Sequence, residues 1–342
     1  MKHTKIKTIS AGILLAALFA SAGCSKEDSV DMPSFEVTLP GSVFKVGEPV
    51  AFSLSGNPDI ISFYSGEAGN AYEYKDKDRI TPAEMTLSFT TLASSGTAGY
   101  PNPAMAPISY STDFDGDYTE EGVRRATWTD ISDNFKFPTD VGQSIPSGTM
   151  FIDDLFPADG RPLYFRFHYQ VDKFDQSAAG GKGNGRTQVN IQNFLINGMT
   201  ASGSTPVYDV LTSGWQCVLT PSYDDCPTAN LPSMPGTSPR ILLRSDFRPT
   251  QDRECWAVSG PLYRAEDVNT GPDMGVGIKT VSDPGLTRYE HTYTTPGTYT
   301  VTFVGANSNV YGRKEVVRQL TLTVVGDEGG ITPPEYEPWP NP

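Results

Sequence analysis

The chain has 342 residues, and its 40 acidic against 26 basic side chains give a formal net charge of −14. An acidic surface of this kind repels nucleic-acid phosphates, so a nucleic-acid partner is excluded. The 33 glycines, 28 prolines, 16 tyrosines and 17 phenylalanines are typical of a loop-rich β protein with an aromatic core. The length is that of two ordinary domains.

The N-terminus carries an export signal. Three lysines lie within the first seven residues, an apolar run follows at 13–20, and Ser21-Ala22-Gly23-Cys24 comes next. The apolar run is too short to span a bilayer, which favours a cleaved signal peptide. The small residues before the cysteine resemble a bacterial lipobox, although Ser21 stands where leucine is more usual. We therefore expect residues 1–23 to be removed and Cys24 to be lipidated; the alternative is a plain signal peptide with an incidental cysteine.

The segment after the anchor is polar and aperiodic, so we expect residues 24–33 to form a flexible tether. Its acidic residues Glu27 and Asp28 resemble the signal that sends Bacteroidota lipoproteins to the outer face of the outer membrane, although Lys26 departs from that pattern. The expected location is the outer membrane, with the protein lipid-anchored and facing the exterior.

Strand patterns lie at both ends of the mature chain. Residues 34–39 and 46–54 alternate apolar and polar side chains, and so do 291–303 on both sides of a Pro-Gly turn. "HTYTTPGTYTVTF" and "VGEPVAFSLSG" resemble parts of one PKD-type immunoglobulin-like domain. Neither end has the roughly seven strands that a sandwich needs. The sequence therefore predicts one all-β sandwich split between 34–79 and 265–326, followed by a Pro-rich tail at 327–342.

A second β domain is expected between the two halves, at 80–264. On the strand at 162–169, the side chains of Phe165, Phe167 and Tyr169 share one face and His168 lies on the other. "YSTDF", "ATWTDI" and "LYFRFHY" resemble jelly-roll modules of secreted bacterial proteins. The expected fold is therefore an inserted jelly roll within a split immunoglobulin-like sandwich.

The order of motifs also resembles a Bacteroides lipoprotein family, the domain of unknown function 5017. The matching segments are "FYSGEAG", "STDFDGDY", "WTDIS", "SDFRP", "CWAVS" and "YTTPGTYTVTFVGANSN", and the resemblance extends from Phe35 to Val325. It implies fold and location, and it implies an outer-membrane transporter complex as a partner in nutrient uptake. Its motifs are structural and assign no activity.

Cysteines and acids supply two candidate sites. Cys217 and Cys226 flank a turn-rich segment and are the preferred disulfide pair, whereas Cys255 beside Trp256 is expected to be a buried thiol. A cluster of acidic residues lies around Gly116, and its candidate metal ligands are Asp113, Asp115, Asp117 and Glu120. This acidic cluster could bind Ca²⁺ as a structural cofactor, with a solvated acidic turn as the favoured alternative.

Aromatic side chains are the remaining candidates for ligand binding. Trp215, Tyr223 and Tyr208 lie in a turn-rich excursion where exposed rings could stack on sugars. Trp128 and Trp256 lie in strand-like contexts and are expected in the core. Neither His168 nor His291 has a nucleophile signature beside it, so no catalytic residue is assigned.

The sequence thus favours a non-catalytic surface lipoprotein that binds an extracellular ligand, with a polysaccharide as the expected class, for a nutrient-uptake system. Two alternatives stay open. One is a structural or adhesive, fimbria-associated surface protein, against which the Pro-rich tail argues because it is poor strand material. The other is a secreted hydrolase whose acids cannot be singled out among the 40 present.

Replacing the anchor residue tests the export prediction. Cys24→Ala removes the sulfur that carries the lipid thioether, so the variant is expected to leave the membrane fraction that holds the parent. Membrane fractionation followed by immunoblotting measures this. A variant that partitions with membranes as fully as the parent would contradict lipidation at Cys24.

Overall fold

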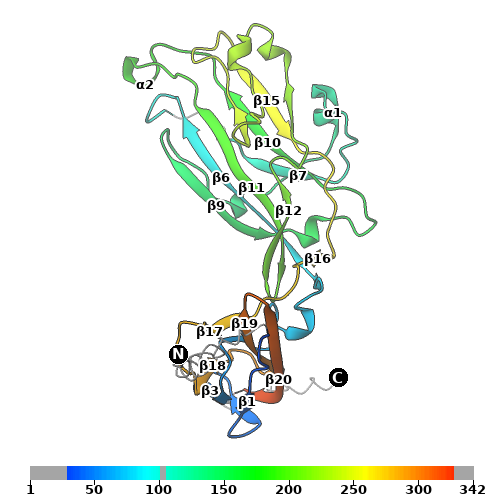
Figure 1. The fold of residues 1–342 in the computed structure, drawn as a ribbon. Helices are drawn as coiled ribbons and strands as arrows, with labels where there is room; N and C mark the ends of the chain where they lie inside the picture. The colour runs from blue at the N-terminus through cyan, green and yellow to red at the C-terminus, as the bar shows by residue number, and fades with distance from the viewer. Residues whose placement is uncertain (1–28, 101–104, 327–342) are drawn as a thin grey trace, which may run out of the picture. The chain divides into compact units, whose positions relative to one another are not determined.

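The computed structural model describes residues 29–100 and 105–326. The chain divides into two compact units. Unit 1 combines the residues up to Lys75 with those from Asp273 onward, and unit 2 runs from Asp76 to Pro272 (Figure 1). Strands dominate both units, and the described residues contain two short α-helices, α1 (Glu120–Arg125) and α2 (Ala178–Gly181). The all-β prediction is confirmed, and no described helix has the length and apolar character needed to cross a membrane.

Unit 1 is a sandwich of two sheets. The smaller sheet has the order β1-β3-β18 and the larger has the order β17-β4-β19-β20-β2. Its strands are β1 (Phe35–Thr38), β2 (Val43–Lys45), β3 (Pro49–Gly56), β4 (Ile60–Tyr64), β17 (Val276–Lys279), β18 (Arg288–Thr292), β19 (Gly297–Asn309) and β20 (Gly312–Val325), with a 3₁₀ turn, η1 (Tyr72–Tyr74). Strand β2 is parallel to β20, and the other pairs are antiparallel.

The two halves of unit 1 interleave. Strand β4, from the first half, lies between β17 and β19, with Phe63 opposite both Val276 and Phe303. Strand β3 pairs with β18 in the other sheet, where Val50 is opposite His291. Each half therefore supplies hydrogen-bond partners to the other, and neither half can complete a sheet alone.

Aromatic side chains from both halves fill the core of unit 1. The ring of Phe303 lies 5.1 Å from that of Phe52 and 5.0 Å from that of Phe63, measured between centroids. His291 Nε2 lies 2.8 Å from Glu67 Oε2, and the Tyr293 hydroxyl donates to the Ser65 carbonyl. His291 thus makes a structural hydrogen bond within the sandwich.

The segment expected to be a flexible tether is held at its C-terminal end. The side-chain amides of Asn309 and Asn307 donate to the carbonyls of Ser29 and Asp31, each at 3.2 Å, and Val30 is buried. The described part of the expected tether, from Ser29 onward, is therefore not flexible, because it packs against the end of the β19–β20 hairpin; residues 24–28 lie outside the described residues. The signal peptide, Cys24 and the tail at 327–342 lie outside the described residues.

Unit 2 is a sandwich of two five-stranded sheets. One has the order β13-β15-β10-β7-β8; the other has the order β12-β11-β6-β9, with β14 also paired to β11. Its strands are β5 (Ile80–Pro82), β6 (Glu84–Ser94), β7 (Ile108–Ser111), β8 (Thr129–Asp130), β9 (Ser144–Phe151), β10 (Tyr164–Val171), β11 (Gln188–Thr200), β12 (Gly203–Asp209), β13 (Gln216–Leu219), β14 (Arg240–Leu243), β15 (Arg253–Val258) and β16 (Asp267–Asn269). The 3₁₀ turns are η2 (Ser132–Asn134), η3 (Asp153–Leu155), η4 (Pro221–Tyr223) and η5 (Thr228–Asn230).

The core of unit 2 lies between its sheets. Phe165, Phe167 and Tyr169 on β10 are fully buried there, which confirms the face assigned to them from the alternating pattern. The ring of Phe167 makes edge contacts with Phe89 on β6 and Phe194 on β11, across the sandwich. The alternate residues of β10 consequently point to the outer face of the sheet.

The boundaries of the inserted unit differ from those expected at 80 and 264. Strand β16 pairs with β5, and Arg79 N donates to Gly271 O, so the residues that follow 264 close a ladder with the start of unit 2. The inserted unit therefore extends from Asp76 to Pro272. The sequence pattern indicates each short strand separately, so it could not show that β16 pairs with β5.

We expect residues 76–272, expressed alone, to unfold cooperatively, because both sheets and the core between them come from this segment. Residues 29–75 alone should show no cooperative transition, because β3 and β4 then lack β18, β17 and β19. Circular dichroism melts of both fragments measure this. A cooperative melt of the shorter fragment would contradict the interleaved description of unit 1.

Candidate functional site

The outer face of the β13-β15-β10-β7-β8 sheet is covered at one place by helix α1. The Thr119 hydroxyl caps the helix by accepting from Gly122 N at 3.1 Å, and acids in the first turn complement the helix dipole. Val123 and Phe114 pack with Trp256 of β15 in a small apolar cluster outside the main core. The helix is thereby fixed on the sheet and presents Arg124 beside it.

Two tryptophans and two arginines form the walls of this site. Trp256 is buried and Trp128 is half-buried, with its indole Nε1 donating to Val123 O at 2.8 Å. The Arg124 guanidinium carbon lies 4.8 Å from the Trp256 ring centroid, and that of Arg166 lies 4.6 Å from the ring centroid of Trp128. Both indoles therefore stabilise cations on their faces.

Glu254 connects the polar groups of the site. Its Oε1 lies 2.9 Å from His168 Nε2, and its Oε2 is paired with Arg124. Arg124 also binds Glu120, one helical turn away, at 2.8 Å. The His168 ring is stacked on Trp256, at 5.7 Å between centroids and 16° between planes. The positions of His168 and Arg124 are thus fixed from two sides.

Arg166 differs from Arg124 because it has no carboxylate partner within ion-pair distance among the described residues. Its Nε donates to Ser109 Oγ at 3.0 Å, and the guanidinium is half-buried on β10. Burial lowers the pKa of Arg166 to about 10. The repulsion of Arg124 acts in the same direction, whereas the attraction of Glu254 opposes the shift. The group stays charged at neutral pH and retains donors for a ligand.

A polar hollow of about 320 Å³ lies between these side chains. A second hollow of about 400 Å³ adjoins it, since Arg124 and Glu254 line both. Residues of the first are Val123, Arg124, Ala126, Trp128, Arg166, His168, Glu254 and Trp256. The two hollows lie along the outer face of β10 and β15, share the Arg124–Glu254 ion pair as a common border, and are together called the groove below.

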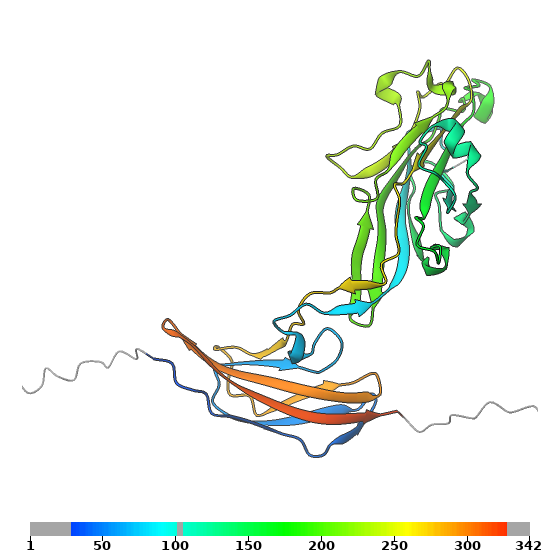
Figure 2. The ribbon, with the colours of Figure 1, turned by 90° about the vertical axis from the view of Figure 1, so that its right-hand side faces the viewer.

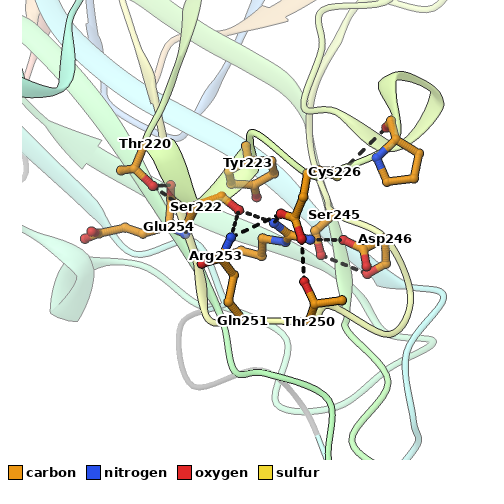
Figure 3. Close-up of polar contacts among 12 residues, drawn as sticks. Thr220, Ser222, Tyr223, Cys226, Ser245, Asp246, Thr250, Gln251, Arg253 and Glu254 are labelled. Atoms are coloured by element: carbon orange, nitrogen blue, oxygen red, sulfur yellow. Dashed lines mark hydrogen bonds and ion pairs between the residues drawn. The ribbon is translucent and has the colours of Figure 1, made fainter.

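A buried arginine fixes the wall of the second hollow (Figure 3). Arg253 is 1% exposed, its guanidinium pairs with Asp225 and with Asp246 at 2.9 Å, and it also donates to the Ser222 carbonyl. The Arg253 guanidinium holds the pKa of the Asp225 carboxyl well below its usual range. This network ties the excursion after β13 to the start of β15, so the wall is a structural element.

The aromatic platform expected from the sequence is not formed, and this corrects its assignment as a ligand site. Trp215 is only 8% exposed and packs against Phe167 and Phe194, with ring centroids 5.4 and 4.9 Å away. Tyr223 is buried, and its hydroxyl donates to Arg244 O. Tyr208 is partly buried against the core, and its hydroxyl accepts from Tyr263 N. The excursion folds back onto the sandwich and encloses Trp215 and Tyr223, whereas Tyr208 lies on β12 and stays partly exposed.

The expected disulfide is absent, because Cys217 and Cys226 are both free, as is the buried Cys255. Cys217 lies opposite Ala257 on β15, whereas Asp225, next to Cys226, is held at Arg253. Burial raises the pKa of the Cys217 thiol to about 12.

The acidic cluster has partners within the chain instead of converging on a cation. Asp115 and Asp117 both pair with Arg125, at 2.7 and 3.2 Å, and Asp113 accepts from Thr127 N at 2.8 Å. Glu120 is bound to Arg124. Within the described residues, no group of three or more His, Cys, Asp or Glu side chains could hold a metal ion. The cluster organises the turn that leads into α1.

The groove was not predicted, although part of its signal lies in the sequence. The alternation on β10 places His168 on the face opposite Phe165, as expected, and Arg166 beside it on the same face. The pairing of β10 with β15 brings Trp256 opposite His168 and Glu254 opposite Gln170. Trp256 was expected in the core and is buried, but beneath α1 on the outer face. Only the strand register and the place of α1 define the site.

The molecule is therefore an all-β protein of two sandwiches, one inserted in the other in sequence, with a polar groove on an outer sheet face. A family model described as "Domain of unknown function (DUF5017)" matches residues 23–215, more than half of the chain, and the protein belongs to this family. The match includes Arg124, Arg166 and His168, and it ends before Glu254. No curated protein and no solved structure matches the chain.

The burial of His168 predicts a loss of stability in mild acid. Burial lowers the pKa of His168 more than Glu254 raises it, while Arg166 and Arg124 lower it further. The unfolded chain therefore binds this proton at a higher pH than the native protein. The contribution of His168 to the free energy of unfolding falls as the pH drops through the unfolded value of about 6.5.

The measurement compares the parent with His168→Gln in urea at pH 8 and pH 5, followed by tryptophan fluorescence. Three of the four tryptophans, Trp128, Trp215 and Trp256, lie in unit 2 and report on it. Relative to the variant, the parent is expected to lose stability between the two pH values. A relative gain for the parent at pH 5 would show that attraction to Glu254 outweighs burial.

Proposed function

We propose that this protein is a non-catalytic surface lipoprotein that binds an extracellular polysaccharide bearing acidic groups in the groove on β10 and β15. One observation carries the proposal: Arg166 is a half-buried cation without an ion-pair partner among the described residues, and it lines an open hollow. A charged, desolvated donor gains most from a ligand that brings an anion. Its fork geometry suits a carboxylate or sulfate group.

The rest of the groove supports a sugar ligand. Arg124, His168 and Glu254 are ordered by one another and offer donors and acceptors for hydroxyl groups. The faces of Trp128 and Trp256 already contact arginines, so recognition rests on hydrogen bonds more than on stacking. The neighbouring hollow of about 400 Å³ extends the binding surface beyond one sugar unit.

The surroundings of His168 in the first hollow support a binding role. The Nε2 atom of His168 is directed at Glu254, and the residues that line its hollow include no serine, threonine or cysteine. In this proposal the protein is held at the outer membrane through Cys24 and delivers its ligand to an outer-membrane transporter complex, as the resemblance to the lipoprotein family implies.

Calorimetry with a polyuronate such as polygalacturonate and with neutral dextran tests the proposal. The polyuronate should bind, and Arg166→Gln should weaken it by roughly 10- to 100-fold, the loss of one charged hydrogen-bonding group of about 1.5–3 kcal/mol. The matched control is Arg161→Gln, since Arg161 is exposed and pairs with Asp159 away from the groove.

Thermal melts of both variants accompany the titrations. The proposal fails if the parent binds neither polymer, or if it binds dextran as tightly as polyuronate. It also fails if the two variants lose affinity equally. Loss of binding together with a collapsed melting transition in Arg166→Gln would assign that residue to the fold instead.

A further inference from the structure

The turn of the β19–β20 hairpin exposes two large apolar side chains. Val310 is 92% exposed and Tyr311 is 53% exposed, between the paired residues Asn309 and Gly312. Neither residue has a positive φ angle, so the backbone of this turn does not require glycine or asparagine at these two positions. Turns are nevertheless built mostly from Gly, Pro, Asn, Asp and Ser, so an exposed valine followed by a tyrosine is unusual here.

The same turn lies beside the start of the described chain (Figure 2). The Asn309 side-chain amide donates to the Ser29 carbonyl, Asn307 holds Asp31, and Val30 between them is buried. Met32, which follows, is exposed and adds a third apolar side chain to this end of unit 1. The N-terminal segment is thus fixed against the hairpin before it leaves unit 1.

The length of chain between Ser29 and Cys24 limits how far the turn can be from the anchor. Five residues span at most about 17 Å when fully extended. A lipid on Cys24 therefore keeps the Val310–Tyr311 turn close to the membrane surface. Strand β20 continues for 14 residues away from the turn, so its other end lies roughly 45 Å farther along the sandwich.

We propose that the Val310–Tyr311 turn contacts the lipid surface that carries the Cys24 anchor, with Val310 inserted among acyl chains and Tyr311 at the headgroup level. This inference rests on the proposed lipid anchor. Aliphatic side chains partition into the hydrocarbon, and tyrosine is enriched at membrane interfaces because its ring is apolar and its hydroxyl is polar.

Charge near the turn permits this contact in a chain whose net charge is −14. Arg313 and Lys314 follow the turn after Gly312, and Glu315 is paired with Arg313 at 3.3 Å. Asp31 and Asp59 are both bonded to Asn307, and Lys279 Nζ donates to the Asp59 carbonyl. These three cations and three carboxylates balance, so the described residues at this end repel anionic headgroups less than the protein as a whole.

A fluorescent label reports on the contact in the full mature lipoprotein. Val310→Cys and the control Val43→Cys are each made in a Cys217→Ser background and labelled with an environment-sensitive dye. Val43 is 60% exposed on β2, which pairs with the far end of β20 at Thr323. The lipoprotein is inserted into vesicles of phosphatidylethanolamine and phosphatidylglycerol, and mass spectrometry establishes the lipid on Cys24.

The expected result is a blue-shifted emission and reduced iodide quenching for the label at 310 on vesicles, with no change for the label at 43. A lipidated protein whose label at 310 stays as quenchable as that at 43 overturns the inference and leaves the anchor intact. An unmodified Cys24 overturns both. A label at 310 already shielded in the lipid-free mature chain would show that protein, and not lipid, covers the turn.

Discussion

The pairing of β4 between β17 and β19 is the constraint on which the rest of unit 1 depends. These strands come from opposite ends of the chain, and 197 residues, from Asp76 to Pro272, separate the two halves. The larger sheet cannot close until the whole of unit 2 has been made. Long-range strand pairing is slow because the chain between the partners must be ordered or confined first. A unit 2 that folds on its own core shortens that effective separation.

Within unit 2, the buried Arg253 and helix α1 support the two sides of the groove on the sheet face. Arg253 fastens the excursion after β13, and α1 covers Trp256 from the other side. The polar side chains between these supports, Arg166, His168 and Glu254, are then held where solvent still reaches them. The groove is thus made by elements that are distant in sequence, since α1 ends at Arg125 and β15 begins at Arg253.

Most of the fold could be predicted from the alternation of apolar and polar residues along the strands. It placed Phe165, Phe167 and Tyr169 inside and His168 outside, and the PKD-like motifs at the chain ends predicted the split sandwich. A turn-rich composition is the same for a segment that projects into solvent and for one that folds back onto the sandwich. The sequence therefore placed Trp215 and Tyr223 on the surface, whereas both are buried. Nor could spacing show that Asp115 and Asp117 are neutralised by Arg125, which lies on the helix that follows.

If the protein is exported as proposed, its buried thiols bear on how the chain matures. Three cysteines allow three intramolecular pairings while unit 2 is unfolded, and none of these bonds exists in the native state. Once the sandwich closes, burial raises the pKa of the Cys217 and Cys255 thiols, so few thiolates remain to attack a disulfide. These two thiols are therefore more open to oxidation in the unfolded chain than in the folded unit 2.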